Sequence, residues 1–245
     1  MSALILLLVV GVAHATWADD CSKISVTGSA TKQLAPDVAY ITLYVNGDGV
    51  LMSDAAKKSD DNVEAVLKAI KEGKTNIIDI AVTIVDVGEK SSRVWSGDQQ
   101  NASPRPQVSK QLRIAIPPDA ALAYEIIDAA IRAGAILTRE SMTHYSGEVR
   151  GAVIYGVKDG SAVEEELKKD AMEDARKQAE KTAQWAGKSI GPLCSVGCQS
   201  VTSWSQGAAF GGKTAEYPTK YLSIDPKQIE IKATISATFE LQEKK

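Results

Sequence analysis

A glycine-rich segment, residues 207–214, carries the pattern in this sequence that most suggests chemistry. It begins with Gly207 and ends in Lys213 and Thr214, which matches the phosphate-loop pattern G-x4-G-K-[ST]. In such loops the N-terminus of a following helix helps to hold the phosphates. No such helix is predicted here, because Pro218 follows closely and biases Tyr217 toward an extended backbone. We therefore expect a flexible loop, and an NTP-binding protein that uses residues 207–214 is the alternative.

Three cysteines, Cys21, Cys194 and Cys198, are candidates for a disulfide bond. If Cys194 and Cys198 lie in one strand, their Cα atoms are about 13 Å apart at 3.3 Å per residue. A disulfide needs Cα atoms closer than about 7 Å. The expected bond therefore joins Cys21 to one of the two others, unless Gly197 bends the strand enough to close a local loop. Three independent small apolar side chains are the alternative.

Other residue types that could do chemistry do not form a catalytic pattern. A lone histidine, His144, is left once a signal peptide is removed, so neither a histidine metal site nor a Ser-His-Asp triad is expected. Carboxylates of the segment 161–186 alternate with lysine and arginine at the spacing of ion pairs on a solvated helix face. Asn101 begins the glycosylation sequon Asn101-Ala102-Ser103, which matters in a eukaryotic host. We expect no enzymatic activity, no catalytic or metal-binding residue and no cofactor.

The N-terminus has the layout of a signal peptide. Residues 4–12 are almost wholly aliphatic, and Ala13-His14-Ala15 follows with an A-x-A cleavage pattern. This segment, residues 1–18, is expected to be cleaved after Ala15 or Ala18. The aliphatic run is shorter than the roughly 20 residues that span a bilayer. We expect an exported chain without a transmembrane anchor, secreted if the host is eukaryotic and periplasmic or in the envelope if it is bacterial.

The composition is that of an ordinary globular protein. The chain has 245 residues, a formal net charge of −3 and 44% apolar residues, which excludes disorder as a description of the whole. Aromatic residues make up 5% of the chain, and there is little basic excess to neutralise phosphates. Nucleic acid is therefore not expected as a partner.

The periodicity of apolar residues predicts the elements that must position these side chains. Alternating residues predict strands at 24–31, 39–45, 78–84, 108–116, 136–145, 194–201 and 229–241. Helical spacing predicts helices at 53–72, 120–132 and 161–186. Loops are expected at 89–106 and 203–226, and the segment 147–160 carries a short apolar stretch at 152–157.

These elements predict an α+β fold with a mixed, mainly antiparallel sheet and helices packed on one face, in a single domain over 22–242. The first two strands are expected to pair as a hairpin around Pro36-Asp37. The third helix carries a stripe of alanines, which predicts close packing against the sheet. The last strand is unusually long, so part of its edge is expected to be unpaired, and Thr234 lies at its middle.

The sequence resembles the SIMPL family, which includes the periplasmic immunogenic protein of bacterial envelopes. The resemblance covers about 24–241 and rests on ISVTG at 24–28, PDVA at 36–39, Asp79, Ile80 and Thr83, DARKQA at 174–179, AG at 186–187, IDP at 224–226 and IEIKA at 229–233. The sequence departs from the family pattern at Pro106-Gln107, where a glycine and an aromatic residue are usual, and in the extra segment 147–160. The resemblance implies an α+β fold, export and self-association, and it brings no catalytic residues.

The sequence therefore favours a non-enzymatic exported protein that forms a homo-oligomer and acts through structure or through a protein partner. A carrier of a small apolar ligand, held between the sheet and the helices, is a further alternative.

Overall fold

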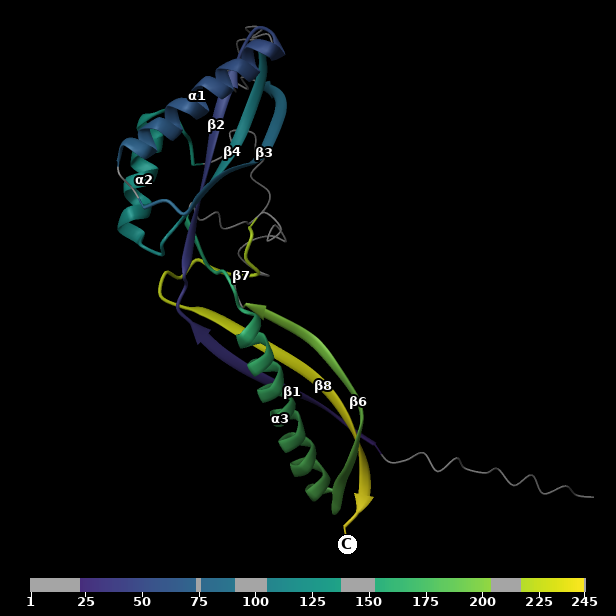
Figure 1. Ribbon diagram of the computed structural model, residues 1–245. Coiled ribbons are helices and arrows are strands. Elements are labelled where there is room, and N and C mark those ends of the chain that lie inside the picture. The colour runs from purple at the N-terminus through teal and green to yellow at the C-terminus, as the bar shows by residue number, and fades with distance from the viewer. Residues whose placement is uncertain (1–22, 74–75, 91–104, 138–152, 204–216, 245) are drawn as a thin grey trace, which may run out of the picture.

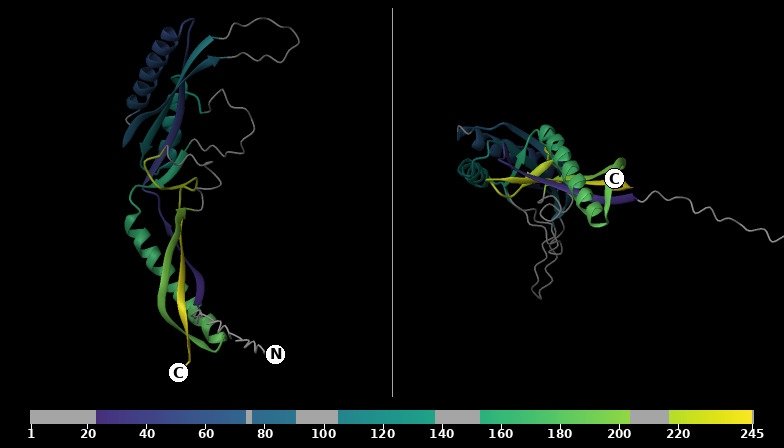
Figure 2. Two further views of the ribbon diagram at one scale, coloured as in Figure 1. Left: turned by 90° about the vertical axis from the view of Figure 1, so that its right-hand side faces the viewer. Right: turned by 90° about the horizontal axis from the view of Figure 1, so that it is seen from below.

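The computed structural model describes residues 23–73, 76–90, 105–137, 153–203 and 217–244. Within them, two antiparallel sheets follow one another along an elongated molecule, and one face of each is covered, by two helices in the larger sheet and by one in the smaller (Figure 1). The views in Figure 2 show the same elongated arrangement. The predicted α+β class, with mainly antiparallel strands and helices on one face, is confirmed.

The larger part of the molecule, which we call the five-stranded lobe, has the strand order β3-β4-β2-β5-β7. Its strands are β2 (Val38–Asp48), β3 (Asp79–Lys90), β4 (Arg105–Ile116), β5 (Val153–Val157) and β7 (Tyr221–Ser223). Helices α1 (Met52–Glu72) and α2 (Ala120–Arg132) cover one face of the sheet (Figure 1). Their apolar faces close over β2 and β4, so the core lies between these strands and the two helices.

The three-stranded lobe has the strand order β1-β8-β6. Its strands are β1 (Lys23–Leu34), β6 (Lys188–Ser203) and β8 (Ile229–Glu243), and α3 (Ser161–Trp185) crosses one face. The alternation in β8 directs Ile229, Ile231 and Ala233 into the core beneath α3. The opposite face of the sheet carries serine, threonine and charged side chains, as the sequence predicted.

The predicted hairpin between the first two strands is wrong. β1 pairs with β8, whereas β2 pairs with β4 and β5 in the other sheet. The connecting Asp37 is fixed by its N–H, which donates to the Gly156 carbonyl at 3.0 Å, and by its carboxylate, which accepts from the Lys158 N–H at 2.9 Å. The turn at Pro36-Asp37 therefore carries the chain from one sheet to the next. Alternation indicates which face of a strand is buried, and it does not identify the partner strand.

The expectation of an unpaired edge on the last strand is also wrong. β8 is the central strand of its sheet, and it pairs with β1 and with β6. Thr234 faces Ser29 on one side and Ser200 on the other. The long partner that the sequence did not reveal is β6, which continues through Ser203 with several irregularities in its register.

Close packing of the alanine-rich helix is confirmed. Ala171, Ala175, Ala179 and Ala183 of α3 are buried, and Gly28 of β1 lies directly beneath two of them. A Cβ atom on Gly28 would lie 2.1 Å from the Ala171 carbonyl oxygen and 2.3 Å from the Ala175 nitrogen. The backbones of helix and strand touch at this point, and no side chain larger than hydrogen fits between them.

Helix α2 has the predicted bounds because local signals determine both of its ends. Asp119 caps it by accepting the N–H of Ala121 at 2.8 Å, and Gly134 follows it with φ of +99°. At the two ends of the loop expected at 89–106, β3 continues to Lys90 and β4 begins at Arg105, and the residues between them lie outside the described part. β7 lies inside the loop expected at 203–226. Of the strand expected at 136–145, the described part contains a single bridge between Ile136 and Tyr44.

Candidate functional site

Most site residues suggested by the sequence lie outside the described residues. These are Cys21, Asn101, His144, the segment 207–214 and the signal segment 1–18. Cys194 is an exposed free thiol on β6, with Sγ 3.9 Å from the Pro192 carbonyl oxygen. Cys198 lies on the same strand, and its side chain is outside the described part. The disulfide of Cys21 and the glycosylation of Asn101 therefore stay predictions.

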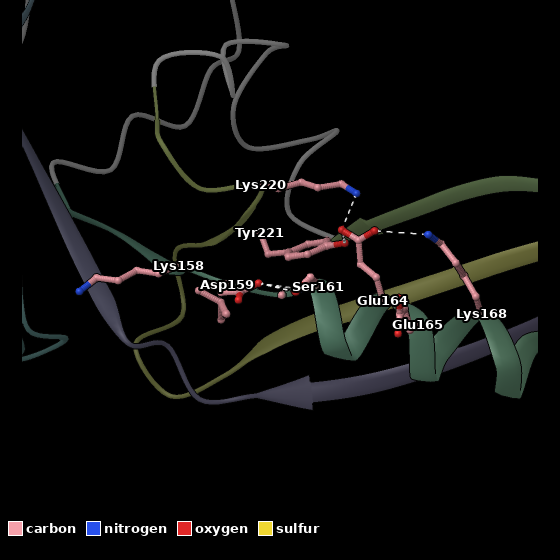
Figure 3. A pocket seen from close by; sticks show the side chains of 10 residues that line it. Lys158, Asp159, Ser161, Glu164, Glu165, Lys168, Lys220 and Tyr221 are labelled. Atoms are coloured by element: carbon pink, nitrogen blue, oxygen red, sulfur yellow. Dashed lines mark hydrogen bonds and ion pairs between the residues drawn. The ribbon is translucent and has the colours of Figure 1, made fainter.

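The structure brings together a polar cluster that sequence reasoning missed, at the first turn of α3 (Figure 3). Glu164 Oε1 accepts a hydrogen bond from Lys220 Nζ at 2.7 Å and from the Tyr221 hydroxyl at 2.5 Å. Its other oxygen lies 3.5 Å from Lys168 Nζ. We call Glu164, Lys168, Lys220 and Tyr221 the Glu164 cluster. It joins α3 of the three-stranded lobe to β7 of the five-stranded lobe.

Gly160 makes room for the ring of Tyr221 in this cluster. Tyr221 is fully buried, and a Cβ atom on Gly160 would lie 2.5 Å from its Cε2 atom. The chain can therefore begin α3 against the face of the ring because residue 160 has no side chain. Asp159 completes the local structure by accepting the N–H of Ser161 at 2.9 Å and its hydroxyl at 2.7 Å.

The electrostatics hold the two acidic groups of the cluster in different protonation states. Hydrogen bonds from Lys220 and then from Tyr221 lower the pKa of Glu164 below its usual range. Burial, and then the hydrogen bond to Glu164, raise the pKa of the Tyr221 hydroxyl well above its usual range. Near neutral pH a protonated tyrosine therefore donates to an ionised carboxylate. Such a pair is poorly matched for proton transfer, and it is well suited to clamping two elements.

Tyr221→Phe is expected to lower the free energy of unfolding by about 1.5–3 kcal/mol at neutral pH, because it removes a hydrogen bond to an ionised group. The folded pKa of Glu164 is depressed, so its stabilising contribution is present above the ordinary pKa of 4.5 and is lost as the pH falls through the folded value. The difference in free energy of unfolding between the variant and the wild type should therefore shrink as the pH falls below about 4.5. Urea unfolding followed by circular dichroism at several pH values measures both effects.

Tyr124→Phe is the matched control for this prediction, because Tyr124 is exposed on α2. It should change the free energy of unfolding by less than about 0.5 kcal/mol. Equal losses from the two substitutions, or a Tyr221→Phe loss that grows toward low pH, would contradict the clamp.

A cavity of about 330 Å³ adjoins the Glu164 cluster. Its wall mixes cations with carboxylates, and it includes Lys158, Asp159, Glu165 and Lys168 (Figure 3). Among the described residues, no group of three or more histidine, cysteine, aspartate or glutamate side chains could hold a metal ion. Opposite charges in this wall already neutralise one another, so it has no strong preference for a charged ligand.

The second candidate surface is β3, the edge strand of the five-stranded sheet. Within the described residues it pairs with β4 alone. Four aliphatic side chains on it are exposed: Val82 (49%), Ile84 (36%), Val85 (57%) and Val87 (56%). A shift in register between Val82 and Ile84 places Ile84 on the face opposite to the other three. The edge therefore presents aliphatic side chains on both faces of the sheet.

Comparison with known proteins yields one family. The family model described as SIMPL, protein of unknown function (DUF541), matches residues 24–239. The match covers strands and helices of both lobes, from β1 through most of β8. No curated protein matches the sequence. In the described part of the chain, no helix is long and apolar enough to cross a membrane.

Proposed function

Because this chain belongs to the SIMPL family, we propose that it is a non-enzymatic exported protein that self-assembles and acts through structure or through protein interaction. The single observation that carries the proposal is the exposed aliphatic edge strand β3. Natural sheets usually protect their edges with charges, prolines or covering segments, because free N–H and C=O groups recruit further strands.

β3 differs from the other long edge strands in how much of it is uncovered. The edge of β1 is partly occupied by α3, since the Ser29 N–H donates to Asp174 at 2.9 Å and Lys32 pairs with Glu166 at 2.5 Å. β6 exposes two aliphatic side chains, Leu193 and Val196, along a strand with an irregular register. β3 exposes four within six residues, so a second copy of the chain pairing there would bury apolar surface as well as form ladder hydrogen bonds.

The proposal is tested by the size of the mature chain in solution. The wild type is expected to form a species larger than a monomer at tens of micromolar, as measured by multi-angle light scattering. Val85→Lys should shift it toward the monomer, with an apparent dissociation constant at least about tenfold weaker, because a buried lysine would face apolar side chains at the contact.

Ile131→Lys is the matched control, because Ile131 is an exposed aliphatic residue of α2, away from the β3 edge. This variant should assemble like the wild type. A monodisperse monomer of the wild type would refute self-assembly. An assembly that survives Val85→Lys would show that β3 is not the contact.

A further inference from the structure

A hollow of about 500 Å³ lies between α1 and β3 in the five-stranded lobe. We call it the α1–β3 groove, and it is lined by Leu67, Lys71, Ile77, Ile80, Val82 and Leu112. Lys71 is the one polar residue in this set. Among the described residues no aromatic ring lines the groove, so its wall suits a flexible aliphatic chain better than a flat ring.

The groove exists because α1 does not extend over the edge of the sheet. The helix buries Val63, Val66 and Ile70 against β2 and β4. β3 lies beyond it, so Val82 stays half exposed while the neighbouring Leu112 is fully buried. Apolar surface of this kind gains free energy when a ligand removes it from water.

Lys71, a lysine without an ion pair among the described residues, lies at this groove. Leu67 and Lys71 also line a second hollow of about 440 Å³, together with Glu64, Lys68 and Glu72. Lys68 and Glu72 form an ion pair at 3.8 Å. Lys71 has no ion-pair partner among the described residues, and it lies where the two hollows meet. An apolar wall with one unpaired ammonium group complements an aliphatic chain that ends in an anion.

We propose that the α1–β3 groove binds a single-chain anionic amphiphile of the fatty-acid class, with the aliphatic chain against Ile80, Val82 and Leu112 and the carboxylate at Lys71. The volume of the groove lies within the usual range of about 300–1,000 Å³ for small-molecule sites. The proposal needs no self-assembly, because both walls of the groove belong to one chain.

Isothermal titration calorimetry with decanoate and dodecanoate at neutral pH tests the proposal. Both probes should bind the purified mature chain. The longer one should bind more tightly, by about fourfold for each methylene buried. Dodecyltrimethylammonium, which has a dodecyl chain and a cationic head, should bind more weakly than dodecanoate because its charge faces Lys71.

Two pairs of variants locate the site. Val82→Asp should weaken dodecanoate binding more than about tenfold, because it places a like charge in the groove. Val87→Asp is its control, an exposed valine on the same face of β3 outside the groove lining, and it should leave binding within twofold. Lys71→Gln should weaken binding about threefold, as an exposed ion pair contributes little. Lys57→Gln, on α1 outside both hollows, should have no effect. Circular dichroism establishes that each variant is folded.

Absence of binding, or equal binding by Val82→Asp and the wild type, would overturn the proposal. Equal loss in Val82→Asp and Val87→Asp would do so too, since it would place the ligand elsewhere on the strand. Repeating the titration with Val85→Lys separates this site from self-assembly. Undiminished dodecanoate binding by that variant supports the groove whatever its assembly state, and loss of binding by the folded variant overturns it.

Discussion

Gly28→Ala is expected to lower the free energy of unfolding by about 3 kcal/mol, near the upper end of the usual cost of overpacking. The added methyl group would meet the carbonyl oxygen of Ala171 and the backbone nitrogen of Ala175, at 2.1 and 2.3 Å. Backbone atoms in the middle of a helix cannot swing aside as the end of a side chain can. The whole helix must therefore move away from the sheet, which opens voids along its buried alanines.

Thermal unfolding followed by circular dichroism measures this effect. A loss of about 3 kcal/mol corresponds to a decrease in Tm of roughly 6–12 °C for a chain of this size. Gly197→Ala is the matched control, because Gly197 lies on β6 of the same sheet and a Cβ atom there would have no neighbour within 4 Å among the described residues. It should change stability by less than about 0.5 kcal/mol. Similar losses in the two variants would show that chain entropy, and not the contact with α3, determines the outcome.

The close contact at Gly28 shows what sequence reasoning could and could not supply. The alanine stripe predicted a tight approach, since helical spacing alone brings Ala171 and Ala175 onto one face. The identity of the residue beneath them depends on which strand the helix crosses, and no local signal states that. The same arrangement recurs in the other lobe, where a Cβ atom on Gly47 would lie 2.3 Å from the Ala55 carbonyl oxygen.

The Glu164 cluster was missed for a related reason. Glu164 resembles its neighbours Glu165 and Glu166 in sequence, and all three were interpreted as part of a solvated helix face. Its partner Tyr221 is 57 residues further along the chain, on a three-residue strand inside a predicted loop. A buried tyrosine usually finds a partner for its hydroxyl, so Tyr221, one of two tyrosines that follow the glycine-rich segment, was the available signal. By contrast, the ends of α2 could be predicted, because the residues that cap the helix, Asp119 and Gly134, lie next to it in the sequence.

The central position of β8 changes the effect expected of a proline at Thr234. The sequence suggested an unpaired edge, and a proline at Thr234 on such an edge would be expected to disrupt assembly. In the structure the N–H of Ser29 points away from β8 to Asp174, which makes Ser29 and Thr234 a non-hydrogen-bonded pair. The N–H of Thr234 therefore points toward β6 and belongs to a central ladder. Proline there would remove a buried hydrogen bond and place its ring against a paired strand.

Thr234→Pro is accordingly expected to cost at least about 3 kcal/mol and to unfold the three-stranded lobe at physiological temperature. Thr31→Pro is the matched control. Thr31 lies two residues from Ser29 on the edge strand β1, so its N–H also points away from β8 and its loss should cost less than about 1 kcal/mol. Urea unfolding followed by circular dichroism compares the two. A Thr234→Pro variant with the stability of Thr31→Pro would contradict the central position of β8.

The β3 edge lies in the other lobe, away from Thr234. Reduced assembly of a misfolded Thr234→Pro chain would therefore carry no information about the proposed contact at β3, and Val85→Lys is the substitution that tests that contact.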